Sequence, residues 1–180
     1  MYYPANLNCC ISIVSNLQSL SIAYCPNIST KSFNGLFKWI STHSCLEYLN
    51  ISSSNLSFVS SFDQLHYARN LVKLEMSNCC IDIAVVQQLT QIIRQSIKLA
   101  DLDLSGCGIT SDQAIQIFNA MNTNYTIERL NVSNNRLAGT ESFINDIANR
   151  NSRTRLEWIG MGATRLDTSL VDKRIKHEIQ

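Results

Sequence analysis

Residues 99–109 decide the fold, and they read Leu99-Ala100-Asp101-Leu102-Asp103-Leu104-Ser105-Gly106-Cys107-Gly108-Ile109. Apolar residues stand at the first, fourth and sixth places of this stretch, a cysteine stands at the ninth, and an isoleucine stands at the eleventh. The residues between the apolar ones are mostly polar, which is the pattern of a short strand with one buried face. The stretch therefore predicts a β-strand that leads into a turn.

The same pattern occurs six times along the chain, and we number the positions of each copy from its first apolar residue. Consecutive copies begin 29, 25, 28, 28 and 29 residues apart. So regular a period predicts a repeat architecture. The six copies begin at Leu17, Leu46, Leu71, Leu99, Ile127 and Leu156.

A helical segment with its own start signal follows most copies of the motif. The second repeat is the shortest, so we expect its helix, near residues 62–69, to be the shortest as well. A single strand–turn–helix unit cannot bury its apolar face alone, so neighbouring units stack into a curved parallel sheet with helices on the convex side. The expected start signals and helices are Thr30 before 31–42, Asp82 before 83–95, Thr110 with Gln113 as a capping box before 111–121, and Thr140 before 141–149.

The motif resembles that of the leucine-rich-repeat family from Leu17 to the C-terminus. Repeats of 28 to 29 residues are similar to the ribonuclease-inhibitor-like subclass, whereas residues 17–28 resemble the cysteine-containing repeats common in F-box proteins. The resemblance implies an α/β solenoid of six repeats over residues 17–166. Residues 1–16 are expected to form a flank or partial cap. Residues 167–180 carry apolar residues at helical spacing, Leu170, Val171, Ile175 and Ile179, and are expected to form a C-terminal capping helix.

Length, charge and cysteine content limit the possible functions. A chain of 180 residues with 45% hydrophobic residues predicts one domain. The net charge of +1 gives no field that would attract nucleic acid or anionic lipid, and no apolar run is long enough for a membrane helix. Without a signal peptide and with seven cysteines, an odd number, we expect reduced thiols and a cytoplasmic protein, with a nuclear or organellar location left open. The sequence does not indicate an oligomeric state.

Position nine of the motif is expected to be structural. The resemblance implies that its side chains face the turn and pair with backbone amides that the bend leaves without partners. No CxxC pair, glycine-rich phosphate loop or nucleophile–base arrangement occurs, so we expect no metal, no cofactor and no catalysis. The position-nine ladder consists of Cys25, Ser54, Cys79, Cys107, Asn135 and Thr164.

The concave face of the sheet is the candidate binding surface, because alternate strand residues point away from the core. Its six acidic residues outnumber its two basic ones, a difference of four negative charges. Its aromatic residues are of the types enriched at binding hot spots. The candidate contact residues are Tyr24, Glu47, Tyr48, Asn50, Lys73, Glu75, Asp101, Asp103, Glu128, Arg129, Asn131, Glu157 and Trp158.

These observations favour a non-catalytic adaptor or scaffold that binds a protein partner, with a basic segment as the expected ligand. Two alternatives stay open at this point. One is the substrate-receptor part of an F-box-type ubiquitin ligase, which would require a longer parent chain because the first sixteen residues are too few for an F-box. The other is an architectural subunit of a cytoskeletal, axonemal or mitochondrial assembly.

Overall fold

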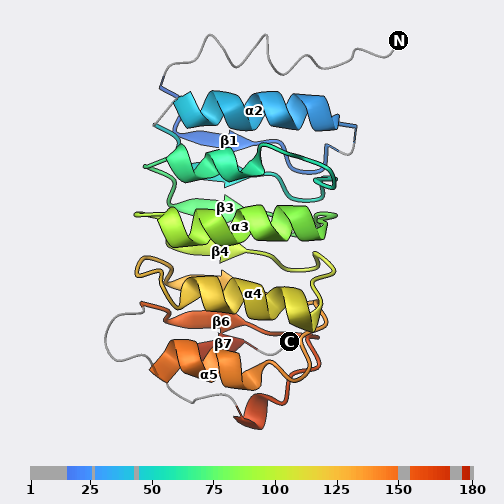
Figure 1. Ribbon diagram of the computed structural model, residues 1–180, viewed down its shortest axis with the longest axis vertical. Helices are drawn as coiled ribbons and strands as arrows, with labels where there is room; N and C mark the ends of the chain where they lie inside the picture. Colours follow the sequence, from blue (N-terminus) through green and yellow to red (C-terminus); the bar gives the residue numbers. More distant parts are fainter. Residues whose placement is uncertain (1–15, 26, 43–44, 150–154, 171–175, 179–180) are drawn as a thin grey trace.

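The computed structural model describes residues 16–25, 27–42, 45–149, 155–170 and 176–178. The described strands form one parallel sheet in chain order (Figure 1). Each strand has three residues. The residue at motif position four of each repeat pairs with its counterpart in the next, from Leu20 and Leu49 to Leu130 and Ile159. The strands are β1 Ser19–Ser21, β2 Tyr48–Asn50, β3 Lys73–Glu75, β4 Asp101–Asp103, β5 Arg129–Asn131, β6 Trp158–Gly160 and β7 Lys176–Glu178.

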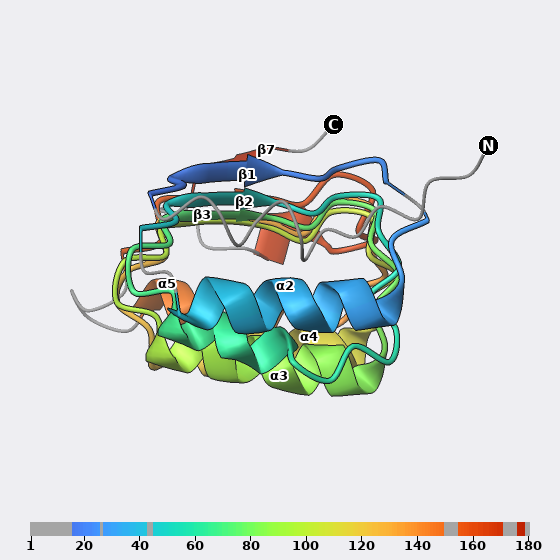
Figure 2. The same ribbon diagram turned by 90° about the horizontal axis from the view of Figure 1, so that it is seen from above.

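Helices cover one face of this sheet, and the other face is open (Figure 2). Strands β1 and β7, at the two ends of the sheet, both lie above β2 and β3 in that view, so the open face is concave. The predicted solenoid architecture is therefore confirmed, and the short second repeat has a 3₁₀ helix in place of an α-helix. The helical elements between the strands are α2 Thr30–Thr42, η1 Phe62–Tyr67, α3 Ile83–Gln95, α4 Ser111–Met121 and α5 Glu141–Asn149.

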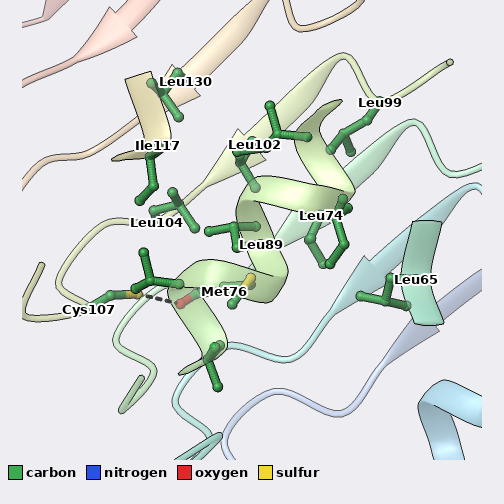
Figure 3. Packing of buried hydrophobic residues seen from close by; sticks show 14 of the residues in the cluster. Leu65, Leu74, Met76, Leu89, Leu99, Leu102, Leu104, Cys107, Ile117 and Leu130 are labelled. Atoms are coloured by element: carbon green, nitrogen blue, oxygen red, sulfur yellow. Dashed lines mark hydrogen bonds between the residues drawn. The ribbon is translucent and has the colours of Figure 1, made fainter. Parts of the chain in front are cut away.

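The core lies between the sheet and the helices and is built from the apolar motif positions. Leu74, Leu102 and Leu104 are fully buried and gather around Leu89 of α3 (Figure 3). Each repeat contributes apolar residues from its strand and from its helix, so burial continues from one repeat to the next. Removing this apolar area from water supplies the main stabilising term, about 25 cal/mol per Å².

Two of the predicted start signals, Asp82 and Thr110, cap their helices, while the Thr140 hydroxyl before α5 donates to the Leu137 carbonyl at 2.8 Å. Asp82 accepts a hydrogen bond from the Val85 amide at 2.9 Å, and Thr110 forms the predicted capping box with Gln113. Helix α2, however, includes Thr30, and the preceding Ser29 accepts from the Ser32 amide at 3.2 Å. The prediction of Thr30 as the cap was wrong, because two residues that can cap a helix stand side by side. The Ser32 amide, three residues after Ser29, has no backbone acceptor among the described residues and bonds to the Ser29 hydroxyl, whereas the Phe33 amide, three residues after Thr30, already donates to the Ser29 carbonyl.

Position eight of all six repeats has a left-handed backbone. Its φ lies between 53° and 67° in Tyr24, Ser53, Asn78, Gly106, Asn134 and Ala163. In the first five repeats its amide donates to the position-seven carbonyl of the next repeat, as from Tyr24 to Ser52 at 3.0 Å. Glycine and asparagine adopt this conformation at low cost, whereas alanine is strained there.

Replacing the exposed Ala163 with glycine is therefore expected to raise the free energy of unfolding by about 0.5–1 kcal/mol, because the strain exceeds the added chain entropy. Urea denaturation measures the effect. Ala138→Gly is the matched control, since Ala138 is also exposed but has no positive φ, and it should be neutral or destabilising. Equal losses of stability in both variants would contradict this account of position eight.

The end of the chain differs from the predicted capping helix over residues 167–180. Among the described residues of this part, Thr168–Leu170 form the short 3₁₀ helix η2 and Lys176–Glu178 form the strand β7, which pairs with β6 through Trp158 and Lys176. These two residues are only 18 positions apart, so β7 follows β6 at less than the repeat period. The helical spacing of apolar residues was overridden because the free edge of β6 presents unpaired backbone groups that another strand satisfies. The flank predicted over residues 1–16 lies, except for Asn16, outside the described residues.

Candidate functional site

Two rows of side chains cross the concave face, and the strand register defines them. Position three supplies Tyr48, Lys73, Asp101, Arg129 and Trp158, which are successive partners in the sheet. Position five supplies the second row beside it. Its members are Asn50, Glu75, Asp103, Asn131 and Gly160. Neighbouring strands lie about 4.8 Å apart, so each residue is within reach of its counterparts in the adjoining repeats.

Glu75 is held by three donors at the N-terminal end of these rows. The Tyr48 hydroxyl donates to Oε2 at 2.7 Å, the Asn50 amide donates to the same oxygen at 2.6 Å, and Lys73 Nζ lies 2.7 Å from Oε1. Partial burial alone would raise the pKa of Glu75, but the contacts with Lys73 and Tyr48 outweigh it and hold this pKa below its usual value. The pKa of Tyr48 is raised, first by burial and then by its bond to the carboxylate. This cluster is a preorganised, charge-balanced patch.

Asp101 stands between two cations at the centre of the face. Its Oδ2 lies 3.9 Å from Lys73 Nζ and 3.8 Å from Arg129 Nε. The Arg129 guanidinium in turn lies 4.7 Å from the centre of the Trp158 ring, a cation–π contact. The position-three row is thus one continuous chain of alternating charges that ends on an indole.

The position-five side chains also support the turns that follow their strands. The side-chain oxygens of Asn50, Asp103 and Asn131 accept from the backbone amides two residues further on, at 2.8–3.1 Å. These residues were predicted only as partner contacts, and their structural role in the turns was not predicted. The signal was present, because an Asn or Asp two residues before a small residue is typical of a turn closed by its side chain.

The charge of the face is lower than the sequence count indicated. Arg155, outside the motif, lies 2.8 Å from Glu128, which leaves a difference of three negative charges between the six acids and the three bases. Most acids have partners, whereas Glu47 and Glu157 are exposed and form no ion pair with the described residues. Tyr24 is exposed in the turn after β1, away from the two rows.

Position nine of the second to sixth repeats forms a ladder of buried side chains behind the face, and most of its hydrogen bonds are to carbonyls. The Cys79 thiol donates to the Ile51 carbonyl at 3.2 Å, and the Cys107 thiol donates to the Met76 carbonyl at 3.0 Å (Figure 3). Burial raises the pKa of Cys79 to about 11 and that of Cys107 to about 12, so both thiols stay protonated and able to donate.

The expected pairing with amides occurs at Asn135, which accepts from the Ile109 amide at 2.9 Å. The backbone amides of Ser53 and Ser54 also act on Cys79, and that of Cys79 acts on Cys107, and they partly offset the rise in the pKa of these thiols. The other members differ from the expected role. Thr164 donates to the Met161 carbonyl at 2.6 Å, Cys25 is exposed, and the buried Ser54 hydroxyl has no hydrogen-bond partner among the described residues.

The part of the chain that the structure describes contains no group of three or more His, Cys, Asp or Glu side chains placed to hold a metal ion. None of its helices combines the length and apolarity needed to cross a bilayer.

No family model matches the sequence, and no curated protein matches it. Solved structures resemble the fold. The actin-binding site 2 domain of leiomodin-1 is 12% identical over 71% of this chain and 79% of its own, with a TM-score of 0.59. The tropomodulin C-terminal domain of Caenorhabditis elegans is 12% identical over 72% of this chain and 83% of its own, with a TM-score of 0.55. The fold is a leucine-rich-repeat solenoid, and the mixture of repeat subclasses stays a prediction.

Proposed function

We propose that the chain is a non-catalytic protein-interaction module that holds a segment of a partner protein against its concave face. The observation that carries the proposal is the position-three row, in which Arg129 lies over Trp158 and Lys73 lies 5.7 Å from the centre of the Tyr48 ring. Aromatic and arginine side chains of this kind supply most of the binding energy at protein interfaces. The core does not need them, since all four side chains are partly or fully exposed on the sheet face.

The charges of the face favour a partner segment with some basic residues. Asp101 and Glu75 are already satisfied by Lys73 and Arg129, so they hold the row in place and offer little further attraction. The exposed carboxylates of Glu47 and Glu157 flank the row and are open to a partner's lysine or arginine. Such rim charges act mainly on the rate of association.

Actin is the first partner to test, because the leiomodin-1 domain with the same fold is an actin-binding site. We expect Trp158→Ala to weaken binding by about 2 kcal/mol or more if the indole is a hot spot. Glu47→Lys with Glu157→Lys should instead slow association and reduce its dependence on salt. Anisotropy of labelled actin measures the affinity, and stopped flow measures the rate.

Lys38→Glu on the exposed face of α2 is the control, since it changes a charge on the opposite side of the molecule. If actin does not bind, affinity capture from the native source supplies the partner, and the same variants are compared with it. Unchanged affinity in the concave variants, together with a loss in Lys38→Glu, would move the site to the helices.

A further inference from the structure

A second surface lies on the edge of the solenoid where the chain passes from each helix into the next strand, on the left in Figure 1. Eight large hydrophobic side chains are exposed among the described residues, and four of them lie on this edge. They come from three consecutive connections, and we call the four together the incoming edge. They are Tyr67 at 48% exposure, Val72 at 39%, Ile97 at 57% and Tyr125 at 50%.

Hydrogen bonds between the three connections bring these side chains into one row. Lys98 Nζ donates to the Asn70 side chain at 2.7 Å and so joins the connections that carry Val72 and Ile97. The Asn124 amide donates to the Ser96 carbonyl at 3.3 Å and joins the connections that carry Ile97 and Tyr125. The three connections are therefore held next to one another by the repeat stack.

Positive charge predominates along this edge. Residues 66–72, 94–100 and 122–128 run through motif position two of their repeats and are all described, and their one acidic residue, Glu128, pairs with Arg155. The exposed cations Arg69 and Lys98 lie in the connections, and the exposed Arg94 lies in the last turn of α3. Arg69 occupies the place two residues before the motif, the same place that Ile97 and Tyr125 occupy in the following repeats. An apolar row beside cations fits a ligand with apolar and acidic groups.

The spacing of the row fits a helix. Consecutive repeats are about 4.8 Å apart, and one turn of an α-helix rises about 5.4 Å, so a helix laid along the stack would place one apolar side chain per turn against each repeat. Amphipathic helices bind hydrophobic surfaces through residues at such intervals. We propose that the incoming edge binds an acidic amphipathic helix of a partner protein, independently of the concave face.

A displayed library of random peptides of about 16 residues, roughly four helical turns, tests this proposal directly. The full chain is the target, and Ile97→Ser/Tyr125→Ser is the counter-selection target. We expect enriched peptides to carry apolar residues at helical spacing with Asp or Glu beside them. No enrichment, or enrichment of Lys and Arg, would overturn the proposal.

The enriched peptide is then synthesised and its affinity measured by fluorescence anisotropy. We expect a loss of about tenfold or more in Ile97→Ser/Tyr125→Ser and a smaller loss, increasing at low salt, in Arg69→Gln/Lys98→Gln. Phe58→Ser is the matched control, because Phe58 is an exposed hydrophobic side chain outside this edge, and Trp158→Ala tests independence from the concave face. Equal losses in Phe58→Ser would show nonspecific adhesion.

Two other occupants are tested with the same variants. Cosedimentation with phosphatidylserine vesicles tests a membrane surface, and sedimentation equilibrium of the chain alone tests a second copy. Vesicle binding or self-association that Ile97→Ser/Tyr125→Ser abolishes would replace the partner helix with that occupant and overturn the proposal.

Discussion

Replacing Asn135 with leucine is expected to lower the free energy of unfolding by about 3 kcal/mol or more. The buried Asn135 amide donates to the carbonyls of Leu104 at 2.9 Å and Val132 at 3.0 Å, and its oxygen accepts from the Ile109 amide at 2.9 Å. Leucine has a similar volume but leaves these groups buried without partners, and each unsatisfied group costs about 1–3 kcal/mol. Urea denaturation followed by far-ultraviolet circular dichroism measures the loss.

Asn135→Cys is the graded control for this prediction. Cys79 and Cys107 occupy the same motif position, and each donates to the position-six carbonyl of the preceding repeat. A cysteine at 135 can keep the bond to Leu104 but cannot accept from the Ile109 amide, so its stability should fall between those of the wild type and Asn135→Leu. A leucine variant as stable as the wild type would refute a structural role for position nine.

Most of the fold could be predicted because the same strand motif recurs in every repeat. Position four is apolar in every copy, and these are the residues that pair across the sheet from Leu20 to Ile159. The starts of α3 and α4 were predicted from Asp82 and Thr110, and in the structure both side chains accept a hydrogen bond from the first turn of their helix. The capping residues and the repeat period predict the same helix at both places, so no competing structure is favoured for either segment.

The concave face was predicted as a set of residues but not as a network. Equal motif positions in neighbouring repeats already place Lys73 beside Asp101 and Asp101 beside Arg129, so the pairing could have been deduced from the register. A count of charged residues ignores these ion pairs and therefore overstates the negative charge that the concave face offers to a partner. Arg155 was missed for a different reason, because it stands just before the motif and only folding brings it to Glu128.

In the C-terminal segment, the local sequence pattern and the tertiary structure favour different secondary structures. Apolar residues at helical spacing favoured a helix, but the strand β7 joins the open edge of β6 instead. A short segment is sensitive to such context, since its own helical preference is weak and a row of unpaired backbone groups is available.

Replacing Asn124 with alanine should be about as damaging as changing Asn135, with a loss of about 3 kcal/mol in the free energy of unfolding. Asn124 is buried at the end of α4, where its amide donates to the Ile93 carbonyl at 2.7 Å. Its oxygen accepts from the amides of Thr126 at 2.8 Å and Ile127 at 2.9 Å. The side chain thus joins the end of α3 to the start of the fifth repeat.

Asn55→Ala is the matched control for Asn124→Ala. Asn55 also stands in an Asn-x-Ser/Thr sequence and accepts from the Ser57 amide at 3.0 Å, but it is exposed, so its loss should cost about 0.5–1 kcal/mol. Asn124→Asp separates donor from acceptor, because aspartate keeps the bonds from Thr126 and Ile127 but turns a negative charge toward the Ile93 carbonyl. We expect Asn124→Asp to be at least as unstable as Asn124→Ala at neutral pH and to recover part of the loss as the pH falls and the carboxyl regains a proton. Equal stability of the aspartate variant and the wild type would show that the donation to Ile93 contributes little, and that Asn124 acts only through the turn that it closes.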